Sequence, residues 1–312
     1  MKEVKDSDYQ ASLKSLDTEE GIDLAFYRPI GYMWARLAKR LGIRPNAITI
    51  ASIFLGVGAG VAFYSTSIWV NIVGMLLLVW ANSFDSADGQ LARMTGDYSR
   101  VGRILDGLSG DLWFVSIYFF ICLRVNHTEL FFAEHPWLIW IIAIAAGICH
   151  GKQAATADYY RQFHLYFLKG KEGSELDTAS ILKERYTDTP WSKLLPKLTL
   201  LFYGNYTASQ EAMSPKMQQL RRRLKAMYGD AMPPQAFRDD FRRMSLPLMK
   251  YTNILTFNGR SIVLFASVLC GLPWLYFVAE LTVFNIILIY MVWRHERMCA
   301  TLLNRLNDGY YN

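Results

Sequence analysis

Residues 69–111 read WVNIVGMLLLVWANSFDSADGQLARMTGDYSRVGRILDGLSGD. The first part of this stretch is apolar, and its length of about 20 residues is enough for a helix to cross a hydrocarbon core about 30 Å thick. The second part carries Asp85, Asp88, Asp106 and Asp111 at the ends of two expected spans, and Asp97 between them. Charged side chains in or beside a membrane span are costly, and by default they mark function. The stretch therefore predicts the class of the fold and the position of its site.

Further apolar stretches lie on both sides of this segment in the 312-residue chain, which is 52% hydrophobic and 19% charged. Neither residues 45–92 nor residues 261–293 contain a Lys or an Arg. This clustering excludes a soluble domain, a disordered protein and a collagen-like fibre. A Gly271-Leu272-Pro273 break divides the last apolar stretch. We expect six spans, at about 48–67, 69–87, 104–123, 137–157, 254–270 and 274–298.

The expected fold is all-α: a polytopic membrane bundle of six transmembrane helices with an N-terminal interfacial helix and a cytoplasmic helical insert. Apolar residues recur at helical spacing among Arg and Lys from Phe26 to Leu41. This pattern suits a helix that lies in the membrane interface, and a plain packing helix would show it as well. The expected regions are a polar N-terminus with the interfacial helix (1–45), helices one to four with the site (46–158), the basic insert (159–253), helices five and six (254–298) and a tail (299–312).

The distribution of Lys and Arg in the loops predicts the orientation, because cytoplasmic loops carry the excess of positive charge. Basic residues precede span one, separate spans two and three, follow span four and follow span six, whereas the opposite side receives only Arg124. Both termini and the site are therefore expected in the cytoplasm. In a bacterium the membrane would be the inner one.

A basic insert follows span four. Residues 160–260 carry 17 Lys and Arg against 9 Asp and Glu, a net charge of +8. Its prolines leave room for short helices around 191–203, 215–228 and 235–250. The run Arg221-Arg222-Arg223 with Lys225 has the composition of a nucleic-acid patch. In a membrane protein we interpret it instead as a surface held against anionic lipid headgroups, and we expect no nucleic acid.

The aspartates predict a metal site, since four carboxylates at one depth on two adjacent helices repel one another unless a cation lies between them. Oxygen ligands suit Mg²⁺ or Mn²⁺. On a helix, Asp85 and Asp88 share a face that Gly89 and Ala92 continue, and small residues there let a planar group approach. Arg93 suits a phosphate oxygen. A metal, a phosphate and a slot for a base together indicate a nucleotide diphosphate.

The pattern Asp85-x-x-Asp88-Gly89-x-x-Ala92-Arg93, eight residues and Gly102-x-x-x-Asp106 resembles the signature of the CDP-alcohol phosphatidyltransferase family. The segment 44–49, RPNAIT, also resembles the family's usual start of its first helix. The resemblance covers about residues 40–158 and 254–298. It implies that the metal ligands are Asp85, Asp88, Asp106 and the last aspartate, and that the nucleotide contacts are Asp88, Gly89, Ala92, Arg93 and Gly102.

The chain departs from the family at the last aspartate of the signature. The family has it at position 110, where this chain has Gly110, and Asp111 follows one residue later. On a regular helix, position 111 lies about 140° from Asp106. A π-bulge would bring both onto one side, and the glycines at 107 and 110 with Ser109 make that turn pliable. With a bulge, Asp111 becomes a metal ligand and the general base, and without one Asp111 points elsewhere.

The resemblance implies transfer of a phosphatidyl group from a CDP-linked lipid, most often CDP-diacylglycerol, to the hydroxyl of a small polar alcohol, with release of CMP. Asp106 and the general base Asp111 are the expected catalytic residues, and a homodimer is implied. In one branch of the family the acceptor carries a phosphate, which Arg260, His150, Lys152 and Arg161 could hold. Lys152 and Arg161 could equally extend toward headgroups.

Other functions compete with this interpretation. A small CDP-alcohol donor with a lipid acceptor is one, and a non-catalytic lipid- or nucleotide-binding relative is another, favoured by the shift of Asp111. A UbiA-like prenyltransferase needs a second Asp-rich motif and about nine spans, and Asp239-Asp240 lies in the polar insert. A transporter needs polar residues at the bilayer midplane, and the first and sixth spans offer few.

Overall fold

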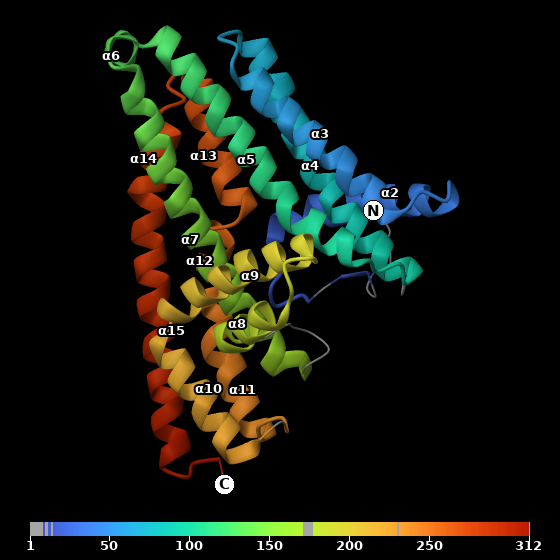
Figure 1. Cartoon of the computed structure of the whole chain (residues 1–312), viewed down its shortest axis with the longest axis vertical. Coiled ribbons are helices and arrows are strands. Elements are labelled where there is room, and N and C mark those ends of the chain that lie inside the picture. The colour runs from blue at the N-terminus through green and yellow to red at the C-terminus, as the bar shows by residue number, and fades with distance from the viewer. Residues whose placement is uncertain (1–8, 10–11, 14, 171–176, 230, 312) are drawn as a thin grey trace. The chain divides into compact units, whose positions relative to one another are not determined.

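The computed structural model describes residues 9, 12–13, 15–170, 177–229 and 231–311, apart from the side chains of residues 100, 101, 103, 104 and 195. The described residues form helices joined by short turns, with no strand among them, so the expected all-α class is confirmed (Figure 1). The elements are the π-helix η1 (Asp23–Tyr27), α2 (Arg28–Arg40), α3 (Pro45–Phe63), α4 (Ile68–Thr95), α5 (Arg100–Thr128), α6 (Leu130–Glu134), α7 (Pro136–Lys169), α8 (Ala179–Asp188), α9 (Leu194–Ala212), α10 (Pro215–Tyr228), α11 (Gln235–Ser245), the 3-10 helix η3 (Leu246–Leu248), α12 (Met249–Ile254), α13 (Phe257–Leu269), α14 (Leu275–Leu281) and α15 (Val283–Asn307).

Five helices are long and apolar enough to cross a membrane: Pro45–Phe63, Ile68–Thr95, Leu105–Thr128, Pro136–Lys169 and Leu275–Asn307. The chain is therefore an integral membrane protein. They correspond to the expected spans one to four and six. The expected fifth span is found as α13, whose 13 residues reach about 20 Å and fall short of a 30 Å core on their own. The expected count of six spans is not confirmed.

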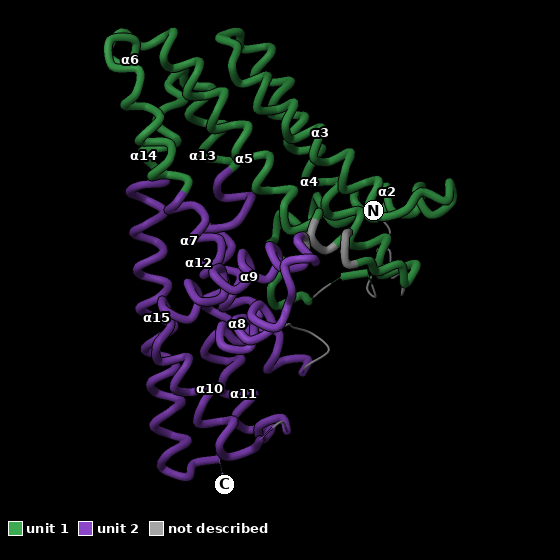
Figure 2. The backbone as a smooth tube through the Cα atoms, in the orientation of Figure 1, with its two compact units in different colours: residues 1–147, 261–279 green, residues 148–260, 280–312 purple. Residues whose placement is uncertain are grey.

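The chain divides into two compact units (Figure 2). Unit 1 comprises residues 1–147 and 261–279, and unit 2 comprises residues 148–260 and 280–312. Each unit therefore joins two parts of the chain that are distant in sequence. The regions expected from the sequence were drawn from the positions of the spans, so they differ from these two compact units. Their borders stay predictions.

In unit 1, a short turn joins α4 to α5. Gly96 ends α4 in the left-handed conformation, with φ of 69°, and its N–H donates to the Ala92 carbonyl at 2.9 Å. Ser99 then caps α5, because its hydroxyl accepts a hydrogen bond from the Gly102 N–H at 2.8 Å. This turn brings the last turns of α4 beside the first turns of α5.

Helix α3 packs closely against α4 and α5 in the same unit. Gly56 lies under the indole of Trp113, and a Cβ at position 56 would come within 2.1 Å of that ring. Small residues at such contacts let membrane helices approach one another closely. The close packing of α3 places its first turn beside the end of α4.

Helix α2 packs on α4 through small residues, since Ala35 and Ala38 are buried in one cluster with Ala87 and Leu91. Its other side exposes apolar side chains at positions 33, 37 and 41. This arrangement agrees with an interfacial helix and with a packing helix alike. The interfacial location of residues 26–41 is not confirmed and stays a prediction.

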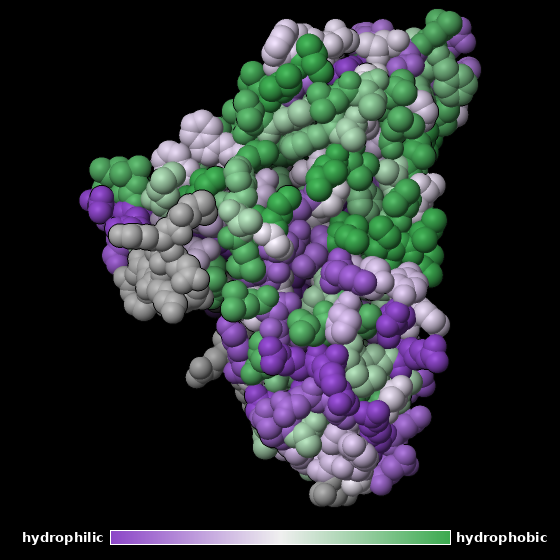
Figure 3. All heavy atoms as spheres, turned by 180° about the vertical axis from the view of Figure 1, so that it is seen from behind, coloured by the Kyte–Doolittle hydropathy of each residue, from purple (hydrophilic) through white to green (hydrophobic). Residues whose placement is uncertain are grey.

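The insert of unit 2 is helical, as expected. The three expected helices are found as α9, α10 and α11, and α8 is a further helix that the sequence pattern did not indicate. The surface shown in Figure 3 is hydrophobic over the membrane-spanning helices of unit 1 and hydrophilic over the insert helices of unit 2. Helix α10 buries Met217, Leu220 and Leu224 on one side and exposes Arg222, Arg223 and Lys225 on the other.

Candidate active site

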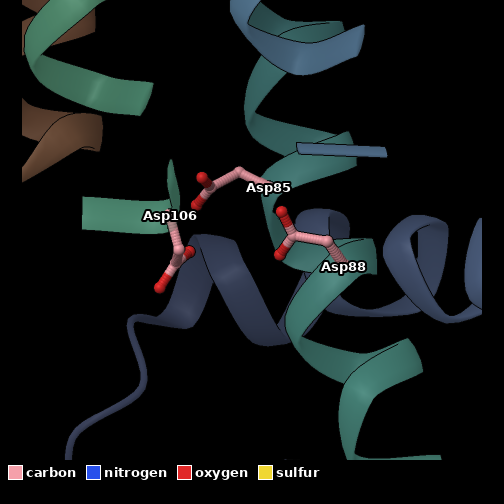
Figure 4. A group of neighbouring side chains, drawn as sticks. All are labelled: Asp85, Asp88 and Asp106. Atoms are coloured by element: carbon pink, nitrogen blue, oxygen red, sulfur yellow. The ribbon is translucent and has the colours of Figure 1, made fainter. Parts of the chain in front are cut away.

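Three carboxylates meet where the end of α4 lies beside the beginning of α5. Asp85 and Asp88 come from α4 and Asp106 comes from α5, and one carboxylate oxygen of each lies within 4.8 Å of the others. Figure 4 shows the side chains of Asp85 and Asp88 extending from α4 toward Asp106. The sequence-based prediction that these three residues share a site agrees with this geometry.

Hydrogen bonds from two neighbouring helices fix two of these carboxylates. Thr49 of α3 donates to Asp88 Oδ2 at 2.5 Å, and Ser109 of α5 donates to Asp85 Oδ1 at 2.9 Å. Asp88 is only 4% exposed, whereas Asp106 lies at the surface of the described chain. Ser109 was not predicted as a contact of the site, and Thr49 stood only within the 44–49 segment. The sequence could have indicated both, since Thr49 lies in the 44–49 segment and Ser109 closely follows Asp106 of the signature.

The carboxylate cluster fits a divalent cation. Three like charges this close repel one another strongly where water is scarce, so a positive charge between them stabilises the arrangement. All the available ligand atoms are hard oxygens, which is the set that Mg²⁺ and Mn²⁺ prefer. The residues can hold such an ion, and its identity stays a proposal.

The helix face beside the cluster is open at Gly89. A Cβ at this position would meet only the guanidinium of Arg93, with Nη1 at 3.5 Å, which is an ordinary contact. Ala92 is half-buried one turn further along α4. The expected slot for a planar group therefore has room at Gly89, and the nucleotide contacts stay predictions.

Gly102 has a structural reason to be glycine. A Cβ there would lie 2.3 Å from Asn46 Oδ1 and 2.8 Å from Ser99 Oγ. Asn46 and Ser99 are themselves hydrogen-bonded at 3.1 Å, so the start of α3 is tied to the start of α5. Gly102 was predicted as a nucleotide contact, which stays a prediction, and it also lies at this close approach between α3 and α5.

The π-bulge expected between Asp106 and Asp111 is absent, because α5 is a regular α-helix from Arg100 to Thr128. Five residues of regular helix turn through about 140° from one side chain to the other. Asp111 is exposed and does not belong to the group formed by the other three aspartates. The bulge hypothesis is therefore wrong, and with it the argument that put Asp111 beside the metal as base.

Residues 43–162 match the family model of the CDP-alcohol phosphatidyltransferases. The resemblance expected from the signature is thus confirmed over this segment, which contains α3, α4, α5 and all three carboxylates of the cluster. The family implies transfer of a phosphatidyl group from a CDP-alcohol in phospholipid synthesis. No curated protein matches the chain.

Unit 2 contains the residues expected to bind the acceptor. Arg260 is 1% exposed, and its two Nη1 contacts to the Glu280 carboxylate measure 2.6 and 2.7 Å. Its Nε donates to the Leu255 carbonyl at 3.1 Å, and its Nη2 contacts Gln153 Oε1 at 3.0 Å and the His150 carbonyl at 3.5 Å. Because the protein itself takes every N–H of this guanidinium, the acceptor role expected for Arg260 is corrected to a structural one.

The other expected acceptor residues have different surroundings in unit 2. His150 Nδ1 lies 3.5 Å from Glu280 Oε1, so His150 adjoins the Arg260 network. Arg161 donates to Asn253 Oδ1 at 2.9 Å, and Lys152 is exposed. Glu280, which completes this network, was not indicated by any pattern in the sequence. Its only signal is a carboxylate in an otherwise apolar stretch.

Proposed function

We propose that the protein transfers a phosphatidyl group from a CDP-diacylglycerol-like donor to the hydroxyl of a small polar alcohol and releases CMP. The observation that carries this proposal is the cluster of Asp85, Asp88 and Asp106 within the segment that matches the family model. The coarse reaction comes from the family, and the choice of donor and acceptor is ours.

In this proposal Asp85, Asp88 and Asp106 hold Mg²⁺ or Mn²⁺. The ion, when bound, neutralises the charge of the pyrophosphate and makes CMP a better leaving group. Thr49 and Ser109 hold Asp88 and Asp85 in place through their hydroxyls. The ligand oxygens therefore lose little conformational freedom when a cation binds, which favours binding.

The donor nucleotide lies along α4 at Gly89 and Ala92, with Arg93 on a phosphate oxygen and Gly102 at the start of α5. Arg93 suits this role because a guanidinium presents paired N–H groups to a phosphate. The open space at Gly89 supports this placement, since only the Arg93 side chain would touch a Cβ there.

The acceptor hydroxyl oxygen attacks the lipid-side phosphorus, the bond from that phosphorus to the CMP oxygen breaks, and the hydroxyl proton passes to a base. Asp106 is the exposed member of the cluster, and its side chain receives no hydrogen bond from the described residues. We therefore assign the proton to Asp106 in place of Asp111. A carboxylate beside a metal-bound reactant is a common general base.

One observation favours a second candidate. The regular α5 removes the fourth carboxylate of the family signature from the cluster, as expected of a relative that binds the nucleotide without turning it over. A small CDP-alcohol donor with a lipid acceptor is compatible with the same site. Both are outcomes of the test below.

The setting of the site completes the proposal. We propose that both termini and the carboxylate cluster face the cytoplasm and that the basic face of α10 meets anionic headgroups, because Arg222, Arg223 and Lys225 are exposed there. A homodimer formed by the spans, with one site in each protomer, is also proposed. Lys152, His150 and Arg161 remain candidates for an acceptor phosphate.

The experiment is a product analysis. Purified protein receives CDP-diacylglycerol, Mg²⁺ and a panel of radiolabelled alcohols, and labelled lipid and free CMP are measured together. We expect one alcohol to give labelled lipid with an equal amount of CMP, and Asp88→Asn to give neither. CDP-diacylglycerol binding without CMP release under every condition would favour the non-catalytic relative. Lipid formed only from a labelled small CDP-alcohol would reverse the donor assignment.

A further inference from the structure

Arg93 is held by a part of the chain that lies outside the family-matched segment. Its Nε donates to the backbone carbonyl of Ser12 at 2.5 Å, across 81 residues of sequence. The other edge of the guanidinium lies against Gly89, since a Cβ there would be 3.5 Å from Nη1 and 3.6 Å from Nη2. One edge is therefore fixed by the backbone and the other adjoins the proposed nucleotide slot.

The Arg93 side chain also keeps a donor without a partner. Among the described residues, nothing accepts a hydrogen bond from its buried Nη2. A buried donor left unpaired costs about 1–3 kcal/mol, so such a group calls for an acceptor that the protein itself does not supply. Because the group is charged and adjoins Gly89, a phosphate oxygen is the acceptor that fits its position.

The N-terminal segment, meaning the described residues from Tyr9 to Tyr27, is anchored on α2 and α4 near this arginine. The Glu19 carboxylate accepts from Arg28 Nε at 2.9 Å, and the Glu19 side chain is 4% exposed. Arg28 in turn donates to Ser86 Oγ at 3.1 Å. The segment is thus tied to α4 near Ser86, through Arg28, and at Arg93, through Ser12.

A second contact reinforces this anchorage. Gln90 Nε2 donates to Ser12 Oγ of the segment at 3.4 Å and to the Arg28 carbonyl at 3.2 Å, and Gln90 is fully buried. Residues 86, 90 and 93 lie on one face of α4 because they are four and three positions apart. The segment therefore covers the face of α4 next to the one that carries the carboxylates.

We propose that the N-terminal segment is part of the donor site and that the Ser12 carbonyl is a positioning group for Arg93. Binding of Nε–H by this carbonyl directs the Nη groups toward Gly89, where they meet a phosphate of the donor nucleotide. Glu19 acts on Arg93 indirectly, because its ion pair with Arg28 holds the segment in place. This inference rests on the proposed function, because it takes the ligand at Gly89 to be a nucleotide.

The test measures CMP binding in the presence of Mg²⁺ by calorimetry on the full-length protein in detergent. Glu19→Gln should weaken CMP binding about tenfold, which is the usual size of a lost charge-assisted contact. Simple electrostatics predicts the opposite sign, since removing a carboxylate near an anion site should strengthen anion binding. Weaker CMP binding by Glu19→Gln would therefore be due to a change in the position of Arg93 and not to the change in charge. Asp97→Asn removes the same charge from an exposed position after α4 and should not weaken binding.

A double variant shows whether the segment acts through Arg93. Arg93→Gln should also weaken CMP binding about tenfold or more, and adding Glu19→Gln to it should weaken binding no further. Ser12→Leu provides a second, independent perturbation, because Ser12 is 1% exposed and a larger side chain there pushes its carbonyl from Arg93. It should give the same loss and the same lack of additivity.

The outcomes separate this inference from the proposed function. Independent losses that multiply in the double variant would overturn the positioning role, as would unchanged binding in both Glu19→Gln and Ser12→Leu. Tighter binding in these variants would overturn it too, since the segment would then compete with the donor. Wild-type protein that binds no CMP would contradict the proposed function itself. Thermal unfolding of each variant confirms that folded protein is compared.

Discussion

Unit 1 and unit 2 each gather charged side chains on apolar helices, and they do so in opposite ways. In unit 1, Asp85, Asp88 and Asp106 gather three like charges. In unit 2, Arg260 meets Glu280 and further acceptors, so that opposite charges and hydrogen bonds balance. A balanced network holds helices together without a ligand, whereas an unbalanced one calls for a cation. The balance of charge therefore distinguishes the candidate site of unit 1 from the structural network of unit 2 more clearly than burial does.

The largest expected effect breaks the balanced network. Glu280→Ala leaves the buried Arg260 without its counter-charge, so the free energy of unfolding should fall by about 3–5 kcal/mol. Chemical or thermal unfolding in detergent measures this loss. The double variant Glu280→Met with Arg260→Met removes both charges and should recover part of it. An unchanged unfolding curve for Glu280→Ala would show that the pair does not support the fold.

The second effect breaks the unbalanced cluster. Asp88→Asn removes a proposed metal ligand, so CMP release should fall at least about 100-fold. Its thermal stability in metal-free buffer should not fall, because one of three repelling charges is gone. A CMP-release assay and a melting curve on the same sample test both statements. Normal turnover with Mg²⁺ would remove Asp88 from the metal site, and Asp97→Asn serves as the control.

The third effect concerns the stabilisation of the folded protein by a divalent cation without nucleotide. Saturating Mg²⁺ or Mn²⁺ should stabilise the wild-type protein by about 1–3 kcal/mol, since a ligand that binds only the folded state shifts unfolding by mass action. The Glu280 and Arg260 double variant should keep this response, and Asp88→Asn should lose it. Equal responses in all three proteins would mean that the cation binds elsewhere.

A smaller effect concerns the slot beside the cluster. Gly89→Leu should weaken CMP and CDP-diacylglycerol binding about tenfold or more, because the side chain fills the space that the nucleotide needs. Stability should be kept or improved, since leucine favours a helix more than glycine. Gly89→Ala, whose Cβ meets only Arg93 at an ordinary distance, should bind nearly normally. Calorimetry that shows full affinity for Gly89→Leu would place the nucleotide elsewhere.

The smallest effect is expected at Asp111. Because α5 is regular and Asp111 lies outside the cluster, Asp111→Asn should change CMP release by less than about threefold. Asp106→Asn removes both a proposed metal ligand and the proposed base, so it should instead lower CMP release at least about 100-fold. A loss of that size in Asp111→Asn, with Asp106→Asn still active, would return the role of the base to Asp111.

The sequence predicted the features that depend on local pattern. Apolar runs located five of the spanning helices, because a helix in a bilayer needs about 20 apolar residues whatever packs around it. The Gly271-Leu272-Pro273 break correctly separated α13 from α14. The spacing of Asp85, Asp88 and Asp106 indicated one site, since the first two share a helix face and the third follows a short turn.

Only the tertiary structure decided which partner each polar group meets. Arg260 was expected to bind an acceptor, and its partner Glu280 comes from another helix 20 residues away. Arg93 meets Ser12 across 81 residues, and Gly102 must be glycine because Asn46 approaches it from α3. No periodicity records such contacts, because they arise from packing between helices. The direction of Asp111 depended on one turn of α5. The sequence was compatible with a π-bulge and with a regular helix in this turn, and the structure has the regular helix.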